Sequence, residues 1–382
     1  MIRKVTAFLL TLSLLLSLLS FPAFAMEVEE VDLDITDLIE EVTEDTVRDK
    51  KDSDGAYLMT ITCTGDFTIG GDNYHHKDIF SPELKKHGGD INFTMKGMRS
   101  IFQDDDLTLV NFEGTFTDTK FVPKNKQGND FLFNISPSYV NVLTDNSIEA
   151  VSLENNHVMD HGEEGYEDTK ETLRSAGVIY SNSEEIGVFE YKNMLQIAML
   201  SYLCIDRYGK KTGEYDTFEE KVCADIAAAK EIYPLVIVSF HWGREKDYSP
   251  TDNQIKLGRM AVDAGADLVI GHHSHRVQPI EFYNGKFICY SLGNFCFAGH
   301  SKPSDMSSIV FQIRYRVKEG NISYRDFRVI PIRISSTKER NDFIPTPFPD
   351  GYERDSVLMT LSSKDNIKNL PYAVTEFPLE WQ

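Results

Sequence analysis

Three of the ten histidines in the sequence lie within four residues of one another, in the segment Gly271–His275. The segment directly follows the largely apolar run Ala266–Ile270, and a second apolar run, Leu235–Phe240, ends directly on His241. Short apolar runs of this kind predict buried strands. Neutral imidazole is a common ligand of transition metals, and carboxylates often complete such sites. Histidines at the ends of two strands therefore indicate a metal site.

Polar residues also follow three strand-like runs further upstream. Asp66, Glu113 and the segment Asn155–His157 each lie within a few residues of the end of such a run. In α/β sheets, ligands bind outside the carboxyl ends of the strands, so we expect the five clusters to meet. Taken singly, Asp66 is typical of a turn, and His241 fits a buried core histidine as well as it fits a ligand. Together, the clusters favour one metal site assembled from five loops.

The segment Asn155–His157 is followed by Asp160, and this spacing has a chemical interpretation of its own. A carboxamide oxygen can bind a metal while the adjacent imidazole, held by a carboxylate, donates a proton to a leaving oxygen. The pattern therefore predicts His157 as a proton donor and Asp160 as its partner.

In an extended segment, alternate side chains point to the same side. This alternation predicts that His273 and His275 face the site together, and that His272 is directed away from it. Three histidines in four residues after a buried strand are seldom structural, so we interpret the cluster as functional.

The first residues predict export. Arg3 and Lys4 precede the continuous apolar stretch Val5–Leu19, and an A-x-A pattern ends at Ala25. This organisation is typical of a signal peptide over residues 1–25 and predicts a secreted or cell-surface protein. The alternative is an uncleaved segment that anchors the chain, because Val5–Ala25 is long enough to span a bilayer.

The charge balance excludes some classes of partner. The chain has 60 acidic and 39 basic residues, a formal net charge of −21, which argues against binding nucleic acid or polyanions in general. A polyanionic polymer would need metal ions or other cations at its binding site. The five cysteines lack tight spacing, so the sequence indicates neither a zinc ribbon nor a disulfide scaffold. It predicts mostly buried free thiols, with one disulfide as the alternative in an oxidising location.

The remaining sequence predicts one α/β domain. Residues 26–55 are acidic and lack aromatic residues, as expected of a linker. Residues 56–335 alternate strand-like runs with helical patterns, including a helix over Glu163–Ala176 and another that begins near Pro250. From Ser308 the pattern predicts a β-hairpin. Residues 336–382 are expected to form a C-terminal tail that packs on the domain.

The order of these clusters resembles the calcineurin-like metallophosphoesterases, and finer motifs resemble the CapA-type poly-γ-glutamate capsule synthesis family. The motifs are Gly65-Asp66, Asn111-Phe-Glu-Gly114, Asn155-Asn-His-x-x-Asp160-His-Gly162, His241-Trp-Gly243 with Glu245, Ala264–His275 and Tyr290-Ser-Leu-Gly-Asn-Phe295. The resemblance covers about residues 58–298. It implies an α/β fold, a four-layer α/β/β/α sandwich with the metal site at the strand ends.

The resemblance also implies a role for each site residue. One metal position would be surrounded by Asp66, Glu113 and His275, and the second by Glu113, Asn156, His241 and His273. His157 would donate the proton, steadied by Asp160, and the supporting polar residues would be Asn155, His272 and Asn294. The implied cofactor is a divalent metal (Mn, Fe or Zn), as one or two ions.

Two departures from the wider metallophosphoesterase pattern affect the first metal position. Thr68 stands where that pattern has a histidine, and Glu113 stands where it has an aspartate. One position thus lacks an imidazole, which predicts weaker occupancy or a single ion. Ser274 replaces a common proline between the last two histidines, a change that should leave both within reach.

Two functions are consistent with these residues. The first is a metal-dependent hydrolase that cleaves a phosphoester or a related bond in an envelope polymer; a γ-glutamyl amide is a weaker candidate for that bond. The second is a non-catalytic component of capsule synthesis that holds the polymer or other capsule-synthesis proteins in the same cleft. Stoichiometric metal and hydrolysis of an aryl phosphate would distinguish the first from the second.

Overall fold

The computed structural model describes residues 50–71, 78–126, 131–205 and 212–361. The expected signal peptide and most of the expected linker lie outside these residues. Among the described residues, no helix is both long and apolar enough to cross a membrane. All five cysteines are described; none forms a disulfide, and Cys63, Cys289 and Cys296 are buried.

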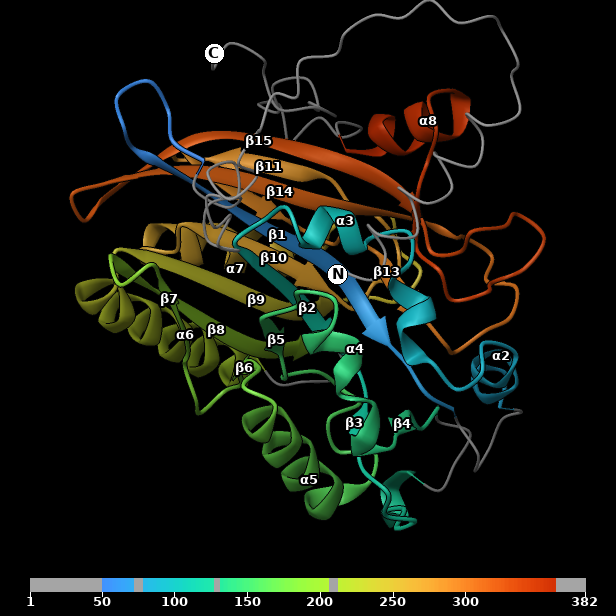
Figure 1. Cartoon of the computed structure of the whole chain (residues 1–382). Helices are drawn as coiled ribbons and strands as arrows, with labels where there is room; N and C mark the ends of the chain where they lie inside the picture. The colour runs from blue at the N-terminus through green and yellow to red at the C-terminus, as the bar shows by residue number, and fades with distance from the viewer. Residues whose placement is uncertain (1–49, 72–77, 127–130, 206–211, 362–382) are drawn as a thin grey trace, which may run out of the picture. The chain divides into compact units, whose positions relative to one another are not determined.

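Two β-sheets form the centre of the described chain (Figure 1). The first has eight strands in the order β16-β15-β14-β1-β2-β5-β6, with β13 paired to β1. Its strands are β1 (Tyr57–Thr68), β2 (Leu107–Phe112), β5 (Ala150–Ser152), β6 (Ile179–Ser181), β13 (Asn294–Phe297), β14 (Ser307–Lys318), β15 (Asn321–Arg333) and β16 (Thr346–Pro347).

The second sheet has six strands in the order β11-β12-β10-β9-β8-β7. They are β7 (Gly187–Tyr191), β8 (Leu195–Ile205), β9 (Leu235–Gly243), β10 (Leu268–His272), β11 (Ile280–Tyr283) and β12 (Lys286–Cys289). A separate small pair consists of β3 (Thr115–Phe116) and β4 (Asn134–Ile135).

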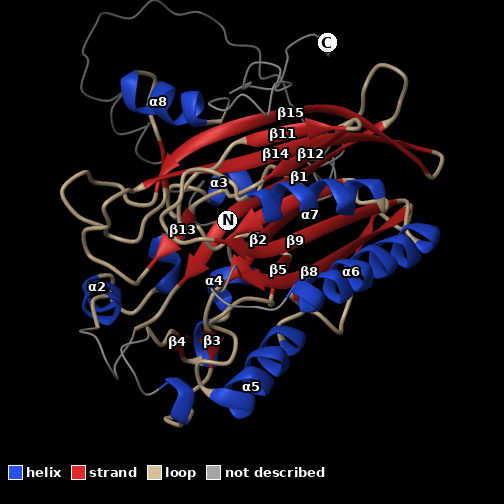
Figure 2. Cartoon of the chain, turned by 180° about the vertical axis from the view of Figure 1, so that it is seen from behind, coloured by secondary structure: helices blue, strands red, loops and turns tan. Residues whose placement is uncertain are grey.

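Helices cover the outer face of each sheet. Long helices α6 (Thr212–Ile232) and α7 (Asp252–Asp263) lie along the six-stranded sheet (Figure 2). The helices on the other side are α2 (Phe80–Lys86), α3 (Arg99–Phe102), α4 (Asn141–Thr144) and α5 (Gly162–Ser175), with 3-10 turns at Ile91–Met95, Lys124–Lys126 and Pro137–Tyr139. The last described helix is α8 (Tyr352–Thr360).

Three apolar cores hold these layers together. Alternate residues of β1, such as Ile61, face Ile197 and Ile270 of the second sheet, while Phe67 belongs to the core beneath α2–α5. A third core lies between the six-stranded sheet and α6 and α7, around Trp242. Because each sheet is apolar on both faces, each needs a layer on either side. The expected four-layer α/β/β/α architecture is confirmed.

Local signals account for several element boundaries. Helix α7 begins with a capping box between Thr251 and Gln254, and Gly265 follows its end with a φ of 121°. Helix α5 ends before Gly177, which has a φ of 72°. The β14–β15 hairpin lies where the alternating pattern predicted it. Beyond residue 335, the chain adds β16 at the sheet edge and then α8.

Strand register sets the position of the polar clusters. β1 pairs in parallel with β2 and β13, which places Asp66 beside Asn111 and Asn294. β9 and β10 are also parallel, and His241 lies beside His272. A Cβ at Gly65 would lie 1.9 Å from the carbonyl oxygen of Gly293, so only glycine allows β13 to approach β1 this closely. The polar clusters therefore come from the carboxyl ends of parallel strands.

Candidate metal centre

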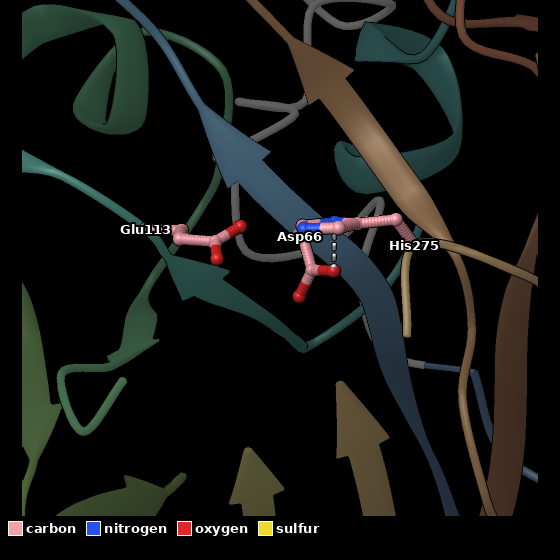
Figure 3. A group of neighbouring side chains, drawn as sticks. All are labelled: Asp66, Glu113 and His275. Carbon is pink, nitrogen blue, oxygen red and sulfur yellow. Dashed lines mark ion pairs between the residues drawn. The ribbon is translucent and has the colours of Figure 1, made fainter. Parts of the chain in front are cut away.

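Asp66, Glu113 and His275 offer ligand atoms that all lie within 4.8 Å of one another. Figure 3 shows Glu113 and His275 reaching toward Asp66 from opposite sides. Asp66 is in β1, Glu113 directly follows β2, and His275 lies in the loop after β10. The Nδ1 atom of His275 is 3.1 Å from Oδ2 of Asp66 and 3.0 Å from Oδ1 of Asn294. Both carboxylates are buried, so this corner of the sheet is strongly polar without being open to water.

Asp66 is held ionised by its surroundings. The carboxamide of Asn111 donates to Oδ1 at 2.9 Å, and the backbone N–H of His273 points at both oxygens. Burial alone would raise the pKa of Asp66, but the imidazoles of His272 and His275 outweigh burial and hold this pKa well below its usual range. A permanent negative charge therefore lies at the centre of the cluster.

One carboxylate oxygen of Glu113 has a hydrogen-bond partner, and the other has none among the described residues. The hydroxyl of Thr68 donates to Oε2 at 3.2 Å. Oε1 is buried without a hydrogen-bond partner among the described residues, yet it lies 3.5 Å from Nε2 of His241 and 3.9 Å from Nε2 of His157. Burial and the charge of Asp66 raise the pKa of Glu113 to about 7. Two buried carboxylates so close together resist ionising at the same time unless a cation joins them.

His241 and His273 form a neutral imidazole pair. Nε2 of His241 lies 3.0 Å from Nδ1 of His273. Burial lowers the pKa of His241 well below its usual range, and the neighbouring His273 adds to this effect. Burial and the charge of His275 lower the pKa of His273 to about 4. Two neutral imidazoles with facing nitrogen atoms are in the protonation state that metal binding requires.

His157 and Asp160 form a second, adjoining unit. Nδ1 of His157 lies 2.7 Å from Oδ2 of Asp160, which leaves Nε2 facing Glu113. Asp160 also accepts from Nζ of Lys126 at 2.8 Å and from the backbone N–H of Phe133 at 2.9 Å. Burial would lower the pKa of His157, but Asp160 outweighs burial and raises it. The geometry suits an imidazole that holds a proton at Nε2 beside the metal centre.

The residues present fit a divalent metal. Oε1 of Glu113 and Oδ1 of Asn156 are buried without hydrogen-bond partners among the described residues, a costly arrangement unless something binds them. The surrounding donors are imidazole nitrogens and carboxylate oxygens, a set typical of zinc, iron and manganese sites. The residues that would hold one or two ions are Asp66, Glu113, Asn156, His241, His273 and His275.

The expectation that His272 points away from the site is wrong. Its Nδ1 lies 3.5 Å from Oδ1 of Asp66, and neither ring nitrogen has a hydrogen-bond partner among the described residues. His272 is the last residue of β10, so it continues the inward face that Leu268 and Ile270 begin. The chain then turns at His273, whose φ is 85°, and the alternation of an extended segment ends there.

The supporting residues form a connected network. Asn155 donates from Nδ2 to the carbonyl oxygen of Phe112 at 2.8 Å and to Oδ1 of Asn111 at 3.3 Å, and its own Oδ1 accepts from the backbone N–H of His157. Asn294 orients His275. These contacts join the loop after β5 to strand β2, and the loop after β10 to strand β13.

Sequence reasoning assigned no role to three residues that the structure brings to the site. Asn111 donates to Asp66 and lies 3.3 Å from Nδ1 of His241. Lys126 binds Asp160 and the carbonyl oxygen of Asn156. Phe133 packs edge-on against His157 with ring centroids 4.9 Å apart. Asn111 lies within a quoted motif and could have been found there, whereas Lys126 and Phe133 lie outside all of the motifs.

Comparison with known proteins gives consistent matches. Residues 60–299 match the family described as bacterial capsule synthesis protein PGA_cap. The PGA biosynthesis protein CapA of Bacillus subtilis is 32% identical over 281 residues, which cover 70% of each chain. The capsule biosynthesis protein CapA of Bacillus anthracis is 26% identical over 341 residues, 84% of this chain and 77% of that protein.

Among solved structures, the calcineurin-like phosphoesterase YfkN from Bacillus subtilis aligns with 75% of this chain and 94% of its own. The TM-score is 0.41 and the sequence identity is 15%.

Proposed function

Because the chain belongs to the bacterial capsule synthesis protein family, we propose that it acts in capsule synthesis as an extracytoplasmic, metal-dependent hydrolase. Its substrate would be a phosphoester or a related bond in an envelope polymer, and it would associate with other capsule-synthesis proteins. The basic, apolar and A-x-A pattern of residues 1–25 supports the extracytoplasmic location.

One observation carries the proposal. Oε1 of Glu113 is buried without a hydrogen-bond partner among the described residues and lies within 4 Å of two imidazole nitrogens, those of His241 and His157. A purely structural carboxylate would be expected to have its oxygens paired. An unpaired oxygen between a cluster of ligand-type residues and an imidazole–carboxylate pair is the arrangement that a metal-dependent hydrolase needs.

A divalent ion bound here would supply a Lewis acid that polarises the substrate oxygen and lowers the pKa of a coordinated water. The protein groups have separate tasks. Asp160 fixes the ring of His157 through Nδ1, which directs Nε2 to the site. From that position His157 would donate its proton to the leaving oxygen. Against burial, His157 and then Lys126 lower the pKa of Asp160, so the carboxylate orients His157 without taking up its proton.

The burial of the site supports the same chemistry. Asp66, Glu113 and His241 are each at most 1% exposed, whereas the side chain of His157 is 13% exposed. The charged groups therefore act in a medium of low dielectric constant, where their interactions are stronger than in water. The proton donor retains access to solvent, as expected for a group that must regain its proton after each turnover, and the side chain of His275 is 17% exposed.

A non-catalytic role in polymer assembly is the second candidate. It is supported by Thr68, whose hydroxyl donates a hydrogen bond to Glu113. Thr68 offers no imidazole, so the first metal position has one histidine ligand fewer than the wider metallophosphoesterase pattern. The test uses protein purified without chelators, measuring metal by mass spectrometry and hydrolysis of aryl phosphates. Stoichiometric metal with chelator-sensitive turnover supports the hydrolase. Absence of turnover in the metal-loaded protein would favour the assembly role.

A further inference from the structure

Aromatic side chains border the candidate metal centre on the side of the proton donor. The ring of Phe133 packs edge-on against His157, with ring centroids 4.9 Å apart. Phe131 then stacks on Phe133, with ring centroids 5.8 Å apart and ring planes 6° from parallel. Phe133 is 4% exposed and Phe131 is 37% exposed, so the stacked rings lead from the imidazole of His157 to the protein surface.

A third ring approaches the same place from the other side of the centre. Phe297, at the end of β13, packs on the proposed metal ligand His275 with ring centroids 5.6 Å apart. A Cβ at Gly299 would lie 2.5 Å from the ring of Phe297 and 3.2 Å from the ring of Phe133, so both rings approach the same backbone position. Phe131, Phe133 and Phe297 therefore form an aromatic wall that connects the proton donor to a proposed metal ligand.

Further apolar side chains are exposed around the loop that contains the proton donor. Met159 lies in the same loop as His157 and is exposed. Phe121 is also exposed, and its carbonyl oxygen lies 2.9 Å from Nδ1 of His161. Nine large hydrophobic side chains are exposed in the described parts of the chain, and three of them, Phe121, Phe131 and Met159, belong to this region. Isolated exposed hydrophobic residues are common, whereas a group of them beside a polar centre indicates a surface for a ligand.

The position of the aromatic wall determines which part of a substrate would meet it. In the proposed reaction His157 donates its proton to the leaving oxygen, so the leaving group would extend from the metal centre past this imidazole. It would there lie against the rings that pack on His157 and His275. Aromatic rings bury a large apolar area, and their faces carry partial negative charge, so the wall favours an apolar group over an anionic one.

We propose that the aromatic wall is the leaving-group subsite of this centre and selects a phosphoester of an apolar alcohol or phenol. The carbon skeleton next to the scissile oxygen packs against Phe131 and Phe297, while Phe133 holds the ring of His157. In the cleavage, the oxygen of one water bonds to phosphorus and the bond from phosphorus to the leaving oxygen breaks. His157 gives its proton to that oxygen, and a proton of the water restores His157. The inference rests on the proposed function, because it names the leaving group of the same reaction.

Binding of a free leaving group tests the subsite without metal or turnover. 2-Naphthol, a flat apolar ring, should bind the parent protein with a change in its fluorescence. Phe131→Ala should weaken this binding about fivefold through the loss of one stacked ring, and Phe131→Tyr should retain it. The matched control Tyr352→Ala removes an exposed ring of α8 and should bind 2-naphthol as the parent does. Displacement of 2-naphthol by 1-octanol would extend the class to chain alcohols, and its absence would restrict the class to flat rings.

Turnover separates the subsite from the hydrolase assignment. With 2-naphthyl phosphate, Phe131→Ala should raise KM about fivefold. With acetyl phosphate, whose leaving group has neither a ring nor a long chain, KM should not change. Equal effects on the two substrates would overturn the subsite, as would 2-naphthol binding that is absent from the parent or unchanged in Phe131→Ala. If no protein hydrolyses either phosphate while Phe131→Ala still loses 2-naphthol binding, the hydrolase assignment fails and the apolar subsite stands.

Discussion

Replacing His157 with glutamine separates a catalytic role from a structural one, because the structure bounds the cost of the change to folding. Asp160 would lose one of three partners and keep Nζ of Lys126 at 2.8 Å and the N–H of Phe133 at 2.9 Å. The lost hydrogen bond and the lost ring contact with Phe133 together cost about 2 kcal/mol of unfolding free energy. Domains are typically stable by about 5–15 kcal/mol, so the variant should remain folded at 25 °C.

The effect on turnover should be much larger. Removing a general acid lowers the rate by roughly 10²–10⁴-fold, which corresponds to about 3–5 kcal/mol of activation free energy. The loss should depend on the substrate. Phenyl phosphate, with a poor leaving group, needs the proton, whereas 4-nitrophenyl phosphate needs it much less. We therefore expect His157→Gln to reduce hydrolysis of phenyl phosphate far more than hydrolysis of 4-nitrophenyl phosphate, with metal content unchanged.

His87→Gln is the matched control, since His87 follows α2 and stacks on Phe93 outside the site. It should leave turnover of both substrates unchanged. Equal losses on the two phosphates would refute the assignment of His157 as a proton donor. Loss of metal from His157→Gln would instead make His157 a ligand or a support for one.

Three further outcomes follow from the contacts and pKa shifts. Asn111 contacts His241 and is not itself a proposed ligand, so Asn111→Ala should weaken metal affinity by roughly 10–100-fold. His241→Ala and His273→Ala should each weaken metal affinity by more than that, because each removes a proposed ligand. Titration with a metal indicator measures the three affinities. With metal removed by a chelator, stability should fall by about 1 kcal/mol per pH unit between pH 7 and 8. The folded pKa of His275, raised to about 9 by Glu113 and Asp66 against burial, exceeds its unfolded value of about 6.5, so this contribution is lost as pH rises. In urea denaturation His275→Gln should reduce the slope, and the part that remains belongs to Glu113, whose pKa is raised to about 7. Burial raises the pKa of Asp105 well above its usual range, and Oδ1 has no hydrogen-bond partner among the described residues. Asp105→Asn should therefore stabilise the protein at pH 7 by about 1–2 kcal/mol. This gain should shrink as pH falls toward about 4, where the unfolded carboxyl is also protonated.

Each of these three results has an outcome that contradicts it. Metal affinity that falls equally in all three site variants would mean that the histidines act no more directly than Asn111. An unchanged slope in His275→Gln would assign the slope to another group. Unchanged stability of Asp105→Asn at pH 7 would mean that the pKa of the buried carboxyl lies near its usual value in the native protein.

Much of the fold could be predicted because its layers depend on local patterns. The apolar runs of β1, β9 and β10 are buried on both faces, and the helices between them carry caps and terminal glycines. Convergence of the polar clusters could be predicted for the same reason, since parallel strands present their carboxyl ends together. The direction of the side chains beyond the end of a strand could not be predicted, because it depends on a single backbone dihedral angle. His272 continues the inward alternation of β10 and faces Asp66, and the left-handed φ of His273 ends that alternation, so that His273 also reaches the site.

The ion pair between Lys126 and Asp160 is a second feature that could not be predicted from the sequence. It follows a surface loop, belongs to no motif and lies 34 residues from Asp160, yet its Nζ is 2.8 Å from that carboxylate. A buried carboxylate needs a compensating charge, so the pair His157–Asp160 required a cation from somewhere in the chain. The sequence shows the requirement but not its source, since any of many lysines could satisfy it.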